Sequence, residues 1–159
     1  MTTWVVDSGP LIFLAKLNRL ELLKKSANVL VIPPTVLQEI QGHHDQACKA
    51  IIQASYSWLK VLSPKSNLIL TALDPGEAEV IALAYEIQAD YVVLDDLQAR
   101  RVARQLNLDS VGTLGLLLAA RLRGEIPSLK TEIMRLQNFG FWANKKVIEA
   151  VLKTAGEIP

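Results

Sequence analysis

Cysteine is almost absent from this sequence of 159 residues, and long apolar runs are absent altogether. The one cysteine, Cys48, allows no internal disulfide bond and no cysteine-based zinc cluster. The longest apolar run, residues 114–120, falls far short of the roughly 18 residues that a membrane span needs. The N-terminus has no basic segment ahead of an apolar one, so we expect no secretory signal. We therefore expect a soluble, cytoplasmic protein with no membrane association.

The remaining composition is that of a folded globular chain. Half of the residues are hydrophobic, which argues against disorder. The length suits one compact domain over residues 1–159. No repeat, low-complexity segment or linker divides the sequence.

The net charge of +1 hides an uneven distribution of charge along the chain. Residues 1–97 hold seven Lys/Arg and eleven Asp/Glu, a balance of −4, whereas residues 98–135 hold seven against three, a balance of +4. An acidic pocket beside a basic flank suits a polyanionic substrate. Charge alone, however, favours the plainer interpretation of a helix with a solvated basic face.

Short apolar segments alternate with helical ones along the chain. β-branched residues and turn signals predict strands, and caps and apolar spacing predict helices. Strands that alternate with helices predict an α/β fold with a mostly parallel sheet. The strands are predicted at residues 3–7, 29–32, 61–62, 91–94 and 110–111, and the helices near 9–17, 20–25, 35–41, 45–58, 74–88, 97–106, 113–123, 128–138 and 144–155.

Acidic residues recur where these elements meet. Asp7 and the pair Asp95-Asp96 directly follow predicted strands, Glu39 lies on the helix after the second strand, and Glu77 lies in a first helical turn. Sites in parallel α/β sheets form beyond the carboxyl ends of the strands, so these acids can face one end of the sheet. Because gathered carboxylates repel one another, they need a cation. The pattern predicts a divalent-metal site and a candidate nuclease.

Each acid taken alone has a plainer explanation. An acid in a first helical turn, such as Glu77 or Glu79, is common compensation of the helix dipole. Asp95 and Asp96 could simply cap the next helix. Asp7 is harder to explain in this way, because an acid that ends a buried strand should be paired or functional.

Several other residues give weaker signals. His43 and His44 are adjacent, and consecutive side chains seldom chelate one ion. Cys48 is expected to be a small buried hydrophobe. Aromatic residues that could stack nucleic-acid bases are better explained by core or interface packing; they are Trp58, Phe139, Phe141 and Trp142.

Five sequence blocks together resemble those of a known family. The chain resembles PIN-domain proteins, in particular the small prokaryotic PIN-like proteins related to the toxin ribonucleases of toxin–antitoxin pairs. The resemblance implies a three-layer α/β/α fold with a mostly parallel central sheet of four or five strands and extra C-terminal helices. It runs from residue 4 to about 155, and the blocks are VVDSGPLI (5–12), VIPPTVLQEI (31–40), LDPGEAEVIALA (73–84), VLDDLQARR (93–101) and VGTLGLL (111–117).

The resemblance also implies a metal-dependent endoribonuclease that uses one or two Mg²⁺ or Mn²⁺ ions. By position, each family acid has a counterpart here, and the small hydroxyl beside the first acid has one too, which could bind a metal water or a phosphate. The counterparts are Asp7 for the first acid, Glu39 for the second, Glu77 for the third with Glu79 as its rival, Asp95 or Asp96 for the fourth, and Ser8 for the hydroxyl. Of these, Asp7 and Asp96 are the expected direct ligands, with Glu39 and Glu77 orienting water or holding a second ion.

The resemblance also directs attention to partners. Arg100, Arg101 and Arg104 begin the helix after Asp96 and are expected to share one face, where they are candidates to hold the RNA backbone. The expected partners are an RNA substrate, a cognate antitoxin and a second copy of the chain in a homodimer. The aromatic segment 137–142 is a candidate for a dimer or antitoxin contact.

Two other function classes remain open. The first is a PIN-like nucleic-acid-binding or regulatory protein with weak or no catalysis, which gains from the glutamate at the third acid position and from the near-neutral charge. The second is a receiver-type phosphoacceptor domain, which also uses an acidic Mg²⁺ pocket. It fits less well, because an acidic pair should follow its first strand and a lysine its last, whereas here Gly112 and Thr113 follow the last strand.

Overall fold

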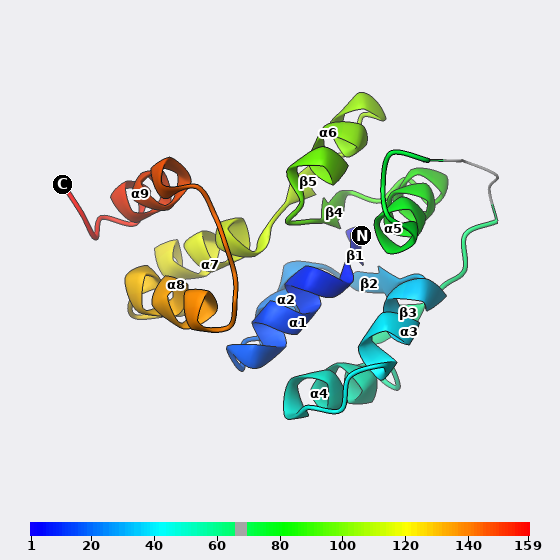
Figure 1. Ribbon diagram of the computed structural model, residues 1–159, viewed down its shortest axis with the longest axis horizontal. Coiled ribbons are helices and arrows are strands. Elements are labelled where there is room, and N and C mark those ends of the chain that lie inside the picture. The colour runs from blue at the N-terminus through cyan, green and yellow to red at the C-terminus, as the bar shows by residue number, and fades with distance from the viewer. Residues whose placement is uncertain (66–69) are drawn as a thin grey trace.

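A five-stranded sheet forms the centre of the computed structural model, which describes residues 1–65 and 70–159 (Figure 1). The strand order is β3-β2-β1-β4-β5, and every neighbouring pair is parallel. The α/β class is therefore confirmed, with an all-parallel sheet. The strands are β1 (Thr3–Val6), β2 (Val29–Ile32), β3 (Leu59–Val61), β4 (Tyr91–Val93) and β5 (Ser110–Val111).

Helices cover both sides of this sheet, as expected for three layers. The last three helices in the chain gather beside one another at the left of Figure 1, where α7 contacts both α8 and α9. In the described part of the chain the helices are α1 (Ser8–Lys16), α2 (Glu21–Ser26), α3 (Pro34–Gln41), α4 (Gln46–Ala54), α5 (Pro75–Glu86), α6 (Leu97–Gln105), α7 (Thr113–Leu122), α8 (Leu129–Asn138) and α9 (Lys145–Thr154).

The region between α4 and β3 differs from the sequence prediction. The predicted helix 45–58 ends at Ala54, because Ser55 caps it and the following residues turn. The strand predicted at 61–62 begins earlier, at Leu59, whose side chain is fully buried and which pairs with Leu30. The apolar side chain of Leu59 thus sets where the strand begins.

The strand order changes direction at β1. The chain places β2 on one side of β1 and β4 on the other, so the switch point of the sheet lies between β1 and β4. Val5 and Val6 are fully buried, and the backbone N–H of Asp7 extends the pairing by donating to the carbonyl of Val93 at 3.1 Å. In open α/β sheets, ligands bind outside the carboxyl ends of the strands at this point.

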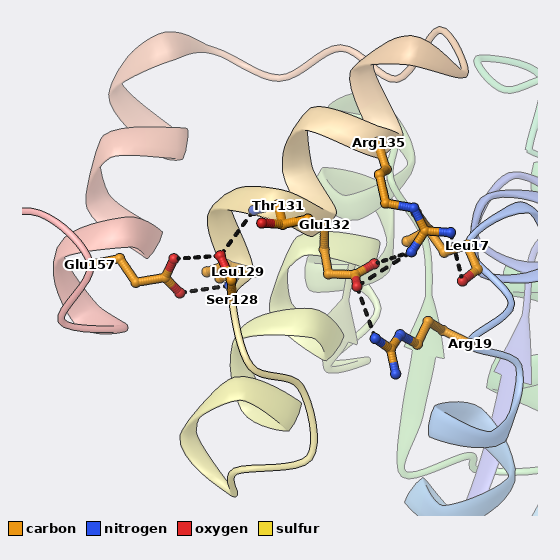
Figure 2. A network of polar contacts seen from close by, with 8 residues as sticks. All are labelled: Leu17, Arg19, Ser128, Leu129, Thr131, Glu132, Arg135 and Glu157. Carbon is orange, nitrogen blue, oxygen red and sulfur yellow. Dashed lines mark hydrogen bonds and ion pairs between the residues drawn. The ribbon is translucent and has the colours of Figure 1, made fainter.

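Ion pairs fasten the C-terminal helices to the rest of the molecule (Figure 2). Glu132 on α8 is buried, and its carboxylate accepts hydrogen bonds from Arg19 at 2.9 Å and from Arg135 at 3.2 Å. Arg135 also donates to the carbonyl oxygen of Leu17 at 3.3 Å, at the end of α1. Because a buried carboxylate needs partners, these contacts fix α8 against the first helices.

A second carboxylate, that of Glu157, closes the N-terminus of α8. It accepts hydrogen bonds from the backbone N–H groups of Leu129 and Lys130 and from the side chains of Ser128 and Arg121. Burial alone would raise the pKa of Glu157, but these hydrogen bonds lower it below its usual range. No helix in the described part of the chain is long and apolar enough to cross a membrane.

Candidate active site

Asp7 lies at the switch point of the sheet. It caps α1, and its Oδ1 accepts a hydrogen bond from the backbone N–H of Ser8 at 2.8 Å. Only 8% of the residue is exposed. Burial, and to a smaller extent the charges of Glu39, Asp74 and Asp95, raise the pKa of this carboxyl, while the Ser8 hydrogen bond lowers it. Together they give a pKa of about 7. A buried carboxylate ringed by other carboxylates attracts cations.

Glu39 reaches the site from α3. Its Oε2 accepts a hydrogen bond from the Ser8 hydroxyl at 2.7 Å. Its other oxygen lies against Gly76 in the first turn of α5, where a Cβ atom would collide with Oε1. Glycine at position 76 therefore leaves room for the Glu39 carboxylate between three helices.

Glu77 joins the same cluster from α5. Burial, together with the charges of Asp74, Asp96 and Asp7, raises the pKa of its carboxyl to about 7. Asp74 caps α5 by accepting from the Glu77 N–H at 2.8 Å. In the sequence, Asp74 has only the pattern of a helix N-cap. Its charge nevertheless acts on both Asp7 and Glu77, and the only available signal was its place three residues before Glu77.

Glu79, the rival of Glu77, has a different partner. Its Oε2 accepts a hydrogen bond from the Thr35 hydroxyl on α3. Residues two apart on a helix point about 200° apart. The two glutamates of α5 thus interact with different neighbours: Glu79 with Thr35, and Glu77 with Asp74.

The adjacent pair Asp95-Asp96 divides in a similar way. Asp95 accepts two hydrogen bonds from Thr113, from its backbone N–H and from its hydroxyl, both at 2.7 Å. Burial raises the pKa of Asp95, while those two bonds and the charge of Arg100 lower it. Asp96 is exposed and caps α6 through the Ala99 N–H at 2.9 Å. Asp95 links the end of β4 to the start of α7 through these hydrogen bonds, whereas the charge of Asp96 acts on Glu77.

The donor set suits a hydrated divalent cation. In residues 1–65 and 70–159, no three His, Cys, Asp or Glu side chains converge closely enough to hold one ion by themselves. Mg²⁺, however, keeps several waters and needs only one or two direct carboxylates. Oxygen donors around a buried Asp7 meet that requirement, and their mutual repulsion would be relieved by a bound cation.

The remaining sequence candidates lie away from this cluster or beside it. His43 and His44 are exposed, and Cys48 is buried as expected. Phe141 packs edge-on against Phe13 at 5.2 Å between ring centroids, whereas Trp142 is 80% exposed. The three arginines lie on α6, the helix capped by Asp96.

Comparison with known proteins agrees with this fold. The chain is an α/β protein with an acidic cluster at the switch point of its parallel sheet. The DUF3368 family model, described as a PIN domain, matches residues 3–157. The chain therefore belongs to the PIN-domain family, whose members are generally nucleases that use divalent metals. No curated protein matches the chain.

Proposed function

We propose that this protein is an endoribonuclease that depends on Mg²⁺ or Mn²⁺ and hydrolyses RNA phosphodiester bonds. The observation that carries the proposal is the buried carboxylate of Asp7, surrounded by the charges of Glu39, Asp74 and Asp95 at the switch point of the sheet. A bound cation would stabilise such a group as an anion. The family membership of the chain supports the same conclusion.

In this proposal a bound divalent ion lowers the pKa of a water molecule and offsets charge that grows on the scissile phosphate. Asp7 and Asp96 would hold the ion directly. Asp7 directly follows β1, Asp96 lies three residues past the end of β4, and the charges of both act on Glu77. Glu39 and Glu77 orient water molecules around the ion. The Ser8 hydroxyl holds Glu39 in place.

Asp95 has a positioning role in this scheme. Its two hydrogen bonds to Thr113 leave it less free than Asp96 to approach a cation. They fix the chain between β4 and α6, and so fix the backbone from which Asp96 projects. Glu79 is the less suitable of the two glutamates on α5, because Thr35 holds its carboxylate.

The direct test is cleavage of a labelled single-stranded RNA by the purified protein in Mn²⁺ or Mg²⁺. We expect cleavage that EDTA abolishes and that an Asp7→Asn variant lacks. Asp45→Asn is the matched control, because Asp45 also caps a helix but lies on the exposed start of α4. Equal rates for the Asp7→Asn variant and the native protein would refute the proposal.

The alternative function is a nucleic-acid-binding protein with little or no catalysis. It is favoured by the absence, among the described residues, of three converging ligand side chains. RNA binding without metal-dependent cleavage would support it. We propose the toxin role on the resemblance of the sequence blocks. Growth arrest on expression that requires Asp7, and that a protein encoded beside this gene relieves, would support that role.

A further inference from the structure

A polar hollow lies beside the edge strand β5, at the amino ends of β4 and β5, whereas the acidic cluster lies at the carboxyl ends of the strands. Its volume is about 360 Å³, within the range of roughly 300–1,000 Å³ that small-ligand sites occupy. It is open to solvent and lies between α6 and the beginnings of β4 and β5. The residues that line it are Tyr91, Arg100, Arg104, Leu108, Asp109 and Ser110.

Two arginines one helical turn apart line this hollow, together with the single carboxylate of Asp109. Arg100 and Arg104 occupy positions i and i+4 on α6, so they lie on the same face of the helix. Neither forms an ion pair within 4 Å in the described part of the chain. Arg101 is exposed on the same helix but is not among the lining residues. Two of the three arginines of α6 therefore line the hollow and contribute positive charge to it.

Arg100 connects the hollow to the acidic cluster. Its Nε donates a weak hydrogen bond to the Ser110 hydroxyl at 3.4 Å, at the start of β5. Arg100 and Asp95 both lie against Gly112. A Cβ atom added to this glycine would be 3.3 Å from Arg100 Nη1 and 2.9 Å from Asp95 Oδ1. The guanidinium thus extends from the hollow to the site at the carboxyl end of the sheet.

An aromatic side chain, that of Tyr91, also lines the hollow. Tyr91 is 40% exposed, and its ring is supported by Trp4 at 5.2 Å between centroids. An exposed aromatic ring beside arginines is the combination that binds single-stranded nucleic acid, since the ring stacks on a base while the arginines hold the backbone. A free phosphate ion would make no use of the ring.

We propose that this hollow is a subsite for single-stranded RNA that extends along the β4–β5 edge away from the acidic cluster, with one backbone phosphate on Arg100 and Arg104 and one base on Tyr91. The proposal rests on the proposed function, because it takes the acidic cluster as the place of cleavage. It assigns Arg101 no contact with the strand at this subsite. Substrate would then cross the β4–β5 edge of the sheet to reach Asp96.

The test compares two substitutions of neighbouring, exposed arginines. Arg104→Gln and Arg101→Gln are each introduced into the Asp7→Asn variant, and binding of a fluorescent single-stranded RNA is measured by anisotropy in Mg²⁺ over a series of salt concentrations. We expect Arg104→Gln to weaken binding about 3- to 10-fold and to reduce the slope of log K against log salt by about 0.7, the value for one phosphate contact. Arg101→Gln should change affinity by less than about twofold.

Three outcomes would overturn the subsite: no RNA binding by the Asp7→Asn parent, equal losses in the two double variants, or an unchanged salt slope for Arg104→Gln. Thermal melting of each variant confirms that it is folded. Failure of the proposed function gives a different result, because the native protein would then not cleave RNA in Mn²⁺ while Arg104-dependent binding persisted.

Discussion

The hydroxyl of Ser8 donates a hydrogen bond of 2.7 Å to the carboxylate of Glu39. This bond joins the residue that begins α1 to the last turns of α3, two segments that follow neighbouring strands of the sheet. The same carboxylate lies against Gly76 on α5. The position of Glu39 therefore depends on a donor on one side and on a missing side chain on the other.

Substitution of Gly76 by alanine should impair the site more than the fold. The new Cβ would collide with Glu39 Oε1, the end of a flexible side chain that can move away. We expect Gly76→Ala to change the free energy of unfolding by less than about 1 kcal/mol, because the residue is helical and alanine favours a helix. RNA cleavage should fall clearly, as measured by initial rates in Mn²⁺.

Gly9→Ala is the matched control for this substitution. Gly9 lies in the first turn of α1, beside Ser8, and a Cβ there would meet nothing within 4 Å. Its cleavage rate should stay near that of the native protein. If both alanine variants cleave RNA at the native rate, cleavage does not require the Glu39 carboxylate in the position that it has in the structure.

Glu77 and Glu79 should differ in their effects, although both lie in α5. Glu77→Gln removes a carboxylate beside Asp74 and Asp96 and should abolish most cleavage. Glu79→Gln leaves an amide oxygen that can still accept from the Thr35 hydroxyl, so activity should be nearly native. Cleavage rates over a Mn²⁺ titration measure both, and a larger loss in Glu79→Gln would reverse the assignment.

Stability of the metal-free protein should fall as pH rises from about 5 to about 7. Folding raises the pKa of Asp7 from its ordinary 3.8 to about 7 and that of Glu77 from 4.5 to about 7. Between these values the folded protein binds more protons than the unfolded chain, so deprotonation favours unfolding. For Asp7 we expect a loss of about 1–3 kcal/mol. Denaturant unfolding in EDTA at several pH values measures it.

Asp7→Asn should flatten this pH profile and stabilise the metal-free protein at pH 8, because the amide carries no charge to bury. Added Mg²⁺ should stabilise the native protein at pH 8 and the variant much less. Asp45→Asn should leave the slope between pH 5 and 7 intact, since the pKa of the exposed Asp45 is lowered rather than raised. A native profile that is flat or rises over this window would contradict the burial of a charged Asp7.

Most of the fold could be predicted from the sequence, because its signals are local. Val29–Ile32 is a β-branched run closed by two prolines, and the strand has those bounds in the structure. α4 was predicted too long, since the sequence around Ser55 allows either a helix or a turn. There the burial of Leu59 in the sheet decides between the two.

The acidic site was only partly predictable, because side-chain direction depends on neighbours from distant segments. Asp7 and Glu39 follow from their places after strands. The division between Asp95 and Asp96 depends on Thr113, which meets Asp95 only once the sheet has formed. Asp74 has the sequence pattern of a helix cap. That pattern explains the residue fully, so nothing in the sequence indicates that its charge also acts on Asp7 and Glu77.

The pairing of β1 with β4 has a consequence during protein synthesis. Asp7 leaves the ribosome early, but its neighbour strand and the Asp95-Asp96 pair come late, and Thr113 comes later still. A nascent chain that ends before β4 contains Asp7, Glu39, Asp74 and Glu77 but lacks Asp95 and Asp96. The acidic centre of the growing chain is therefore incomplete while it is still beside messenger and ribosomal RNA, until well over half of it has been translated.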